Sequence, residues 1–213
     1  MTLFTLQDVN FKNIIRYPNI EIKAHITTFI SGESGSGKST LLRLFNGLIC
    51  PSEGKIFYQG KDISTYDPIH IRREVLLISQ TVYLFSESIR DNFHRFREYR
   101  LLEPIQDEQI KQYLEICSLH LDLDSPCDVL SGGEKQRVFI AINLSLGSQV
   151  LMLDEPTSAL DDKNAKSLLK SLKDYSKEHN MTLLVVSHDS QIVAEYADEI
   201  IHLNNSADKT KME

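Results

Sequence analysis

A run of glycines followed by a lysine and a serine is the most distinctive chemical pattern in this sequence. Residues 32–39 match G-x-x-x-x-G-K-[ST], between a strand-like apolar run that ends at Ile30 and a helical pattern that opens at Thr40. In such a loop, backbone N–H groups converge on phosphate oxygens at a helix N-terminus, and the lysine adds a positive charge. We therefore expect a phosphate-binding loop, here called the P-loop, formed by Gly32, Glu33, Ser34, Gly35, Ser36, Gly37, Lys38, Ser39 and Thr40.

Two adjacent carboxylates follow a buried-strand pattern in the second half of the chain. Residues 150–153 are wholly apolar, and Asp154 and Glu155 come directly after them. Beside a P-loop, this arrangement suits phosphoryl chemistry, with Ser39 and Asp154 as oxygen ligands of Mg²⁺. Glu155 is then expected to polarise the attacking water, as a general base or as an orienting acceptor. If strand geometry continues, the two carboxylates face opposite sides and serve different roles.

Gln80 and His188 stand at the ends of two further strand patterns. Gln80 follows residues 75–79, and His188 follows residues 183–187. In open α/β sheets, ligands gather at the carboxyl ends of the strands. We therefore expect both side chains to lie beside the P-loop and to take part in function.

The elements that must position these residues alternate between strand and helix. Strand patterns cover residues 26–30, 75–79, 150–153, 183–186 and 200–203, and helical spacing appears in residues 41–48 and 165–175. This alternation predicts a mostly parallel sheet covered by helices. Residues 55–60 indicate one arm of an antiparallel hairpin. Between about residues 84 and 147 polar helical patterns replace the strands, which predicts a helical lobe.

The composition excludes several classes of protein. The chain has 213 residues and a net charge of −7, which fits a single domain and argues against a general nucleic-acid binder, because phosphate contacts require a basic face. The apolar runs are strand-sized, far below the ~20 residues that a membrane-spanning helix needs. Three irregularly spaced cysteines and an N-terminus without a secretory signal indicate a reducing cytosol.

Residues 130–137 read Leu-Ser-Gly-Gly-Glu-Lys-Gln-Arg. Ser131 as N-cap and Glu134 three residues later predict a capping box, at the start of a helix that closes near Gly147. The two glycines leave bare N–H groups and a positive dipole end available to an anion. Residues 130–134 also strongly resemble the signature motif of the ATP-binding cassette (ABC) ATPases.

The resemblance extends over almost the whole chain. After the P-loop come a Q-loop at Gln80, the signature motif, the Asp154-Glu155 pair, a D-loop that ends at Asp161 and a switch histidine at His188. The resemblance implies an α/β P-loop NTPase of ABC type, with a mostly parallel sheet core, an antiparallel β edge and a helical subdomain. It also implies one nucleotide-binding domain over residues 1–213, with a RecA-like core at about 1–83 and 148–205 and the helical subdomain at about 84–147.

The same resemblance implies ATP and Mg²⁺ as cofactors and a second copy of the chain, or a homologous subunit, as partner. In the family two cassettes meet head to tail in the presence of ATP, so that the signature motif of one acts on the phosphates held by the P-loop of the other. Beyond the P-loop, the implied nucleotide contacts are Ser131, Gly132, Gly133 and Asp161, the metal ligands are Ser39, Gln80 and Asp154, and the catalytic residues are Gln80, Glu155 and His188.

One departure from the family pattern concerns the adenine. Relatives usually place an aromatic side chain against this base, at a position where the present chain has Asn13. Tyr17, which we take as the candidate nucleotide contact, or Phe11 replaces that aromatic, or else both pack in the core. Two smaller departures, Glu134 in place of a glutamine and Ile142 in place of an arginine, are compatible with function.

Residues 80–85 and 89–92 resemble the corresponding region of exporter-type cassettes and of ATPase subunits proposed to export iron or other metals. There the segment receives a helix of the membrane subunit, and Val82, Tyr83, Leu84 and Phe85 suit such docking if they are exposed. Packing between the lobes is the alternative for these side chains.

The resemblance thus implies ATP hydrolysis that powers transport of an unidentified substrate through a separate membrane-spanning subunit. That subunit would hold the chain on the cytoplasmic face of the cell membrane. The alternative is a soluble ABC ATPase of DNA repair or translation, although such proteins generally carry a long coiled-coil insertion or two cassettes. A P-loop kinase is a further alternative, but it has no place for the signature motif or for His188.

Overall fold

Five parallel strands form the centre of the fold. The structure is a computed structural model that describes residues 1–204, so residue 205, the last of the predicted core, lies outside the described residues. The parallel sheet has the strand order β10-β4-β9-β8-β7. All five strands were predicted, and they are β4 (Thr27–Gly32), β7 (Val75–Ile78), β8 (Val150–Asp154), β9 (Thr182–Val186) and β10 (Glu199–Leu203).

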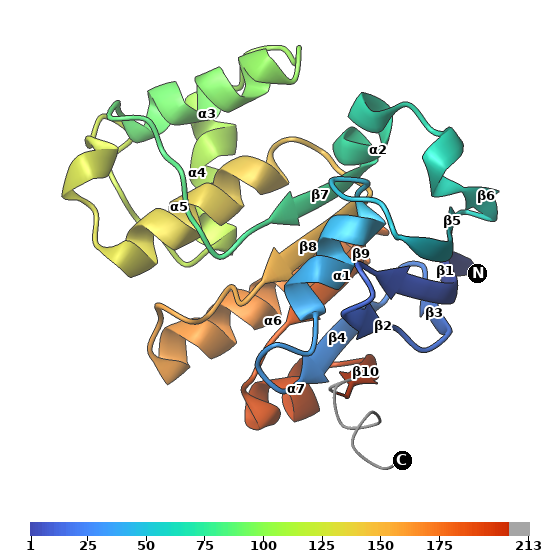
Figure 1. The fold of residues 1–213 in the computed structure, drawn as a ribbon. Helices are drawn as coiled ribbons and strands as arrows, with labels where there is room; N and C mark the ends of the chain where they lie inside the picture. Colours follow the sequence, from blue (N-terminus) through green and yellow to red (C-terminus); the bar gives the residue numbers. More distant parts are fainter. Residues whose placement is uncertain (205–213) are drawn as a thin grey trace.

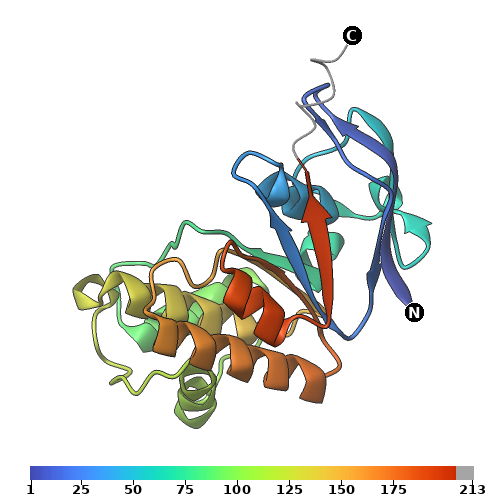
Figure 2. The ribbon, with the colours of Figure 1, turned by 90° about the horizontal axis from the view of Figure 1, so that it is seen from below.

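The parallel sheet is covered on both faces, and successive side chains of each strand point to opposite sides and so pack into different clusters. In β9, Leu183 and Val185 pack into one hydrophobic cluster, whereas Leu184 and Val186 pack into the other. We call these clusters the helix-side core, which contains residues of α3 to α6, and the strand-side core, which contains residues of α1, β1 and β5. Figures 1 and 2 show the two sides as a group of helices and a second sheet, with the parallel sheet between them.

The second sheet is antiparallel and contains five strands in the order β2-β1-β5-β6, with β3 paired to β1. The predicted hairpin arm is present as β5, which pairs with β6. The three N-terminal strands were not predicted, because β1 contains shifts in register against both β3 and β5 and because Asp8 within it has a positive φ of 52°. These irregularities interrupt the two-residue alternation that identifies a strand. The strands are β1 (Thr2–Phe11), β2 (Ile15–Arg16), β3 (Ile20–Lys23), β5 (Glu53–Tyr58) and β6 (Lys61–Asp62).

Helix α1 (Lys38–Phe45) joins the two sheets. Leu41, Leu42, Leu44 and Phe45 are fully buried in the strand-side core, and α1 contacts strands of both sheets. The ring of Phe45 lies 4.5 Å from that of Phe4 on β1, centroid to centroid. The chain continues after β6 through a short 3₁₀ turn, η1 (Ile63–Thr65), and α2 (Pro68–Glu74). Because α1 packs against both sheets, its N-terminal end is fixed at the carboxyl end of β4.

The remaining helices cover the other face of the parallel sheet. Between β7 and β8 the described chain contributes no strand to either sheet. Among the described helices, none combines the length and the apolar character required to cross a membrane. These elements are α3 (Ile89–Tyr99), α4 (Asp107–Ile116), the 3₁₀ turn η2 (Cys127–Val129), α5 (Gly132–Leu144), α6 (Asp162–Glu178) and α7 (Ser190–Tyr196).

Candidate functional site

The P-loop connects β4 to α1 in a conformation that only glycine adopts readily at several positions. Gly37, the N-cap of α1, has a φ of 92°, in the left-handed region. A Cβ atom at Gly32 would lie 2.3 Å from the carbonyl oxygen of Leu203, so β10 leaves no room for a side chain there. The loop therefore presents its backbone at the first turn of α1, where N–H groups without helical partners suit an anion.

Lys38 lies inside this loop. Its Nζ donates hydrogen bonds to the carbonyl oxygens of Gly32, at 2.8 Å, and Glu33, at 2.7 Å. Burial lowers the pKa of Lys38, whereas the nearby carboxylates of Glu155 and Asp154 act in the opposite direction. The ammonium group thus lies at the loop and within the electrostatic influence of the two carboxylates.

Ser39 and Asp154 meet across the site. The Ser39 hydroxyl donates to Oδ1 of Asp154 at 3.1 Å. Burial raises the pKa of Asp154, and the hydrogen bond from Ser39 opposes this effect. A hydroxyl and a carboxylate oxygen at this separation are hard donors of the kind Mg²⁺ prefers. The donor set therefore fits the expected metal.

The Glu155 carboxylate contacts two side chains that were predicted to lie beside it. His188 Nε2 lies 2.7 Å from Oε1 of Glu155, and the Gln80 amide nitrogen donates to Oε2 at 3.4 Å. The carboxylate and the imidazole are both partly exposed, with 26% and 47% of their side chains accessible. Strand geometry ends here, because Glu155 has a φ of 53°. The carboxyl ends of β7, β8 and β9 thus bring Gln80, Glu155 and His188 together beside the P-loop.

The signature residues lie in a different part of the molecule. Figures 1 and 2 show the start of α5 well apart from the P-loop between β4 and α1. The predicted capping box is present: the Ser131 N–H donates to Oε2 of Glu134 at 2.9 Å, and the Glu134 N–H donates to the Ser131 hydroxyl at 3.3 Å. The Ser131 hydroxyl also donates to Oε2 of Glu134 at 2.6 Å, and this bond, together with that from the Ser131 N–H, lowers the pKa of Glu134. Ser131 and Gly132 are exposed, so the start of α5 is accessible to a partner.

Asp161 is engaged as a helix cap. Its carboxylate is the N-cap of α6 and accepts the backbone N–H of Asn164 at 2.9 Å and the Asn164 side-chain amide at 2.6 Å. These hydrogen bonds lower the pKa of Asp161. A direct contact between Asp161 and a nucleotide stays a prediction.

The structure corrects the expectation that Tyr17 stacks on adenine. The Tyr17 side chain is only 3% exposed, so its ring offers no open face to a base. Its hydroxyl instead donates to the carbonyl oxygen of Gly37 at 2.8 Å. Burial raises the pKa of Tyr17. Phe11 is partly buried against the strand-side core, and the Lys12 ammonium lies 5.3 Å from its ring centroid.

One residue that reaches the site was not predicted. The side-chain amide of Gln136, on α5, donates to the backbone carbonyl oxygen of Glu155 at 3.3 Å. The sequence contains no local signal for this contact, because Gln136 occupies an ordinary helical position beyond the capping box.

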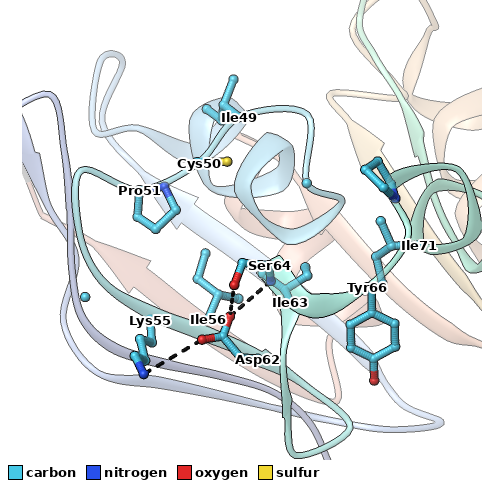
Figure 3. A pocket seen from close by; sticks show the side chains of 13 residues that line it. Ile49, Cys50, Pro51, Lys55, Ile56, Asp62, Ile63, Ser64, Tyr66 and Ile71 are labelled. Atoms are coloured by element: carbon cyan, nitrogen blue, oxygen red, sulfur yellow. Dashed lines mark hydrogen bonds and ion pairs between the residues drawn. The ribbon is translucent and has the colours of Figure 1, made fainter.

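A cavity lies away from the predicted site. The cavity has a volume of about 410 Å³. Figure 3 shows the apolar side chains of Ile49, Ile56 and Tyr66 among the residues that line it. Asp62 beside it accepts the backbone N–H and the hydroxyl of Ser64, at 3.0 and 2.7 Å. The cavity adjoins the C-terminal end of α1, whereas the P-loop is at the N-terminal end. None of the predicted site residues lines it.

The fold and the site together define a P-loop nucleoside triphosphatase. Residues 15–158 match the family described as ABC transporter. The chain belongs to this family, as predicted from its motifs, and is an ATP-binding subunit whose ATP hydrolysis powers transport.

Curated relatives agree over nearly the full chain. The phosphate import ATP-binding protein PstB of Saccharolobus solfataricus is 36% identical over 92% of this chain and 81% of its own length. The probable iron export ATP-binding protein FetA of Escherichia coli K12 is also 36% identical, over 96% of this chain and 92% of its own length. Among solved structures, a dimeric bacterial ABC transporter cassette has a TM-score of 0.82 at 26% identity, with 95% of each chain covered.

Proposed function

We propose that two copies of this chain, or this chain and a homologous subunit, meet head to tail and hydrolyse ATP held between them. One observation carries the proposal: Glu155, His188 and Gln80 lie together beside the P-loop, whereas the exposed start of the signature helix, at Ser131 and Gly132, lies elsewhere on the same chain. A signature motif so placed has no access to its own P-loop. In the head-to-tail arrangement, Ser131, Gly132 and Gly133 act on the phosphates of the partner's ATP.

Each of these groups then has a role in phosphoryl transfer. The P-loop N–H groups and Lys38 hold the phosphates, which positions the γ-phosphate for attack. Mg²⁺, held by Ser39 and Asp154 with Gln80 as a further ligand, would neutralise negative charge on the phosphates. Glu155 orients the attacking water and accepts its proton, and His188, 2.7 Å away, fixes the direction of that carboxylate.

The membrane partner is proposed to dock on an aromatic surface that follows β7. Tyr83 and Tyr99 are 61% and 63% exposed, and Phe85 lies between them, with ring centroids 5.1 and 6.1 Å away. Aromatic side chains of this kind are common anchors in protein interfaces. A helix of the membrane subunit seated here would hold the chain at the cytoplasmic face of the membrane.

The cargo is proposed to depend on the membrane subunit rather than on this chain. The two relatives described above are equally identical to the chain, and their names specify phosphate import and iron export. Residues 84–147 are proposed to form the helical subdomain that carries both the docking surface and the signature motif, with the RecA-like core on either side of it in sequence.

Replacement of the proposed base tests the catalytic assignment. Glu155→Gln should keep ATP binding but lower turnover at least about 100-fold, because a general base contributes 10²–10⁴-fold. ATP should then accumulate in a stable dimer, visible by gel filtration. Glu178→Gln, at the exposed end of α6, is the matched control and should behave as the unmodified chain does. Normal turnover of Glu155→Gln would overturn the assignment.

A further inference from the structure

The backbone of Glu155 adopts an unusual conformation that requires support. Its φ of 53° lies in the left-handed region, which is unfavourable for residues other than glycine. Such conformations persist where neighbouring groups determine them, and they are frequent at active sites. The Glu155 N–H donates to the carbonyl oxygen of Val186 on β9 at 3.1 Å. The Glu155 carbonyl oxygen accepts the Ser158 N–H at 3.3 Å and, in addition, a side-chain amide of α5.

Gln136 supplies this second contact. Its Nε2 donates to the Glu155 carbonyl oxygen at 3.3 Å, and the residue is only 5% exposed. Its Oε1 is buried and has no hydrogen-bond partner within the described residues. Burial of an unpaired polar atom is unfavourable. If packing were the only role of this side chain, an apolar one of the same size would fill the space at a lower cost in free energy. The presence of an amide at this buried position therefore indicates a function for its hydrogen bond to the Glu155 carbonyl oxygen.

A second contact on the same face of α5 also joins this helix to the segment that follows β8. Gly133 lies three residues before Gln136, so that both project to one side of the helix. A Cβ atom at Gly133 would lie 3.0 Å from the carbonyl oxygen of Ala159 and 3.0 Å from Cδ2 of Leu160. The start of α5 is therefore in close contact with the segment that follows Glu155. A shift of α5 would displace that segment as well.

We propose that Gln136 is a positioning residue, which fixes the backbone of Glu155 in its own chain and so directs the Glu155 carboxylate toward His188 and the attacking water. This inference rests on the proposed role of Glu155 as the base. Gln136 belongs to the helix whose N-terminus is proposed to contact the ATP of the partner's site. It thereby connects the signature motif, which acts on one site, to the base of the other site.

A heterodimer with a single competent site separates this role from damage to the signature helix. The reference pair combines a Lys38→Ala chain with a Ser131→Arg chain, and the working P-loop and base then belong to the Ser131→Arg chain. Gln136→Met, which has similar volume and no amide, is introduced into one chain or the other. Differently tagged chains and sequential affinity purification isolate the heterodimers, and kcat and KM for ATP are measured.

The proposal predicts an effect in one arrangement only. With Gln136→Met in the chain that holds the working base, kcat should fall about tenfold while KM stays within about twofold, as expected for a displaced catalytic group. With Gln136→Met in the chain that supplies the working signature motif, kcat should equal that of the reference pair. Equal losses in both arrangements, a loss only in the second, or no loss in either would overturn the proposal.

Two further measurements complete the test. Asn143→Leu is the matched control, because Asn143 is a 5% exposed amide on the same helix, and its Nδ2 donates, among the residues that the structure describes, to the carbonyl oxygen of Phe139. It should leave kcat unchanged. An inactive reference pair would count against the head-to-tail arrangement and not against Gln136. In that case single-turnover rates of ATP hydrolysis decide. Gln136→Met should slow the unmodified chain but should not further slow the Glu155→Gln variant. Equal, additive effects in the two backgrounds would reject a role of Gln136 through Glu155.

Discussion

Tyr17 and Gly37 form a partly buried contact at the start of α1, through the 2.8 Å hydrogen bond from the tyrosine hydroxyl to the glycine carbonyl oxygen. Gly37 is the N-cap of that helix, so the bond helps to hold the last turn of the P-loop. We expect Tyr17→Phe to lower the free energy of unfolding by about 0.5–1.5 kcal/mol, because one partly buried hydrogen bond is lost while the Gly37 carbonyl oxygen keeps the Leu41 N–H at 2.8 Å. Urea unfolding followed by circular dichroism measures the change.

The control for this prediction is Tyr83→Phe, which removes the hydroxyl of a tyrosine that is 61% exposed. It should leave the free energy of unfolding unchanged. If Tyr17 acted only as a surface for adenine, Tyr17→Phe would also be neutral, because phenylalanine keeps the ring. A neutral result would therefore contradict the structural role assigned to the hydroxyl.

At the scale of elements, Asn92 of α3 secures the segment that follows β7. The residue is 0% exposed, and its Nδ2 donates to the carbonyl oxygens of Phe85, at 3.1 Å, and Ser88, at 3.0 Å. Its Oδ1 accepts the Phe85 N–H at 2.9 Å. This side chain therefore determines how Phe85 and the neighbouring aromatic rings sit beside α3. The proposed docking surface depends on it.

Asn92→Ala should consequently lower the free energy of unfolding by about 1–3 kcal/mol, because the Phe85 N–H loses its acceptor, whereas the Phe85 and Ser88 carbonyl oxygens keep the backbone N–H groups of Glu87 and of residue 92. Binding of a membrane-subunit peptide at the aromatic surface should weaken as well. Glu98→Ala changes an exposed residue of the same helix and should alter stability by less than about 0.5 kcal/mol. An equally small effect of Asn92→Ala would show that the segment is held by other contacts.

At the scale of the whole molecule, the two cores share a single sheet, since alternate residues of β9 point into each. We therefore expect one cooperative unfolding transition. The cysteines report on it, because Cys50 is exposed, whereas Cys117 and Cys127 are buried in the helix-side core. Burial raises the pKa of Cys127 to about 11, which keeps it in the unreactive thiol form at neutral pH.

A thiol reagent should accordingly modify Cys50 alone in the folded chain. In increasing urea, the other two thiols should become reactive with the same midpoint that far-UV circular dichroism gives for the whole molecule. Cys50→Ser is the control and should show no reaction before the transition. Earlier reaction of Cys117 and Cys127 would mean that the helices around α3 to α5 unfold as a separate unit.

Features that depend on short stretches of chain could be predicted from the sequence. The five parallel strands, the P-loop and the Ser131–Glu134 capping box each follow from residues close together in sequence, so their hydrophobic period, glycine spacing and polar ends were sufficient. The meeting of Gln80, Glu155 and His188 was also predictable, because neighbouring parallel strands end at one edge.

Tertiary structure alone decided the contacts between distant segments. Tyr17 was a plausible surface for adenine by its position, yet packing against the strand-side core buries its ring and directs its hydroxyl to Gly37. The amide of Gln136 meets the Glu155 carbonyl only because α5 packs against the end of β8. Neither contact leaves a periodic pattern in the sequence, since each depends on where one side chain meets another element after the whole chain has folded.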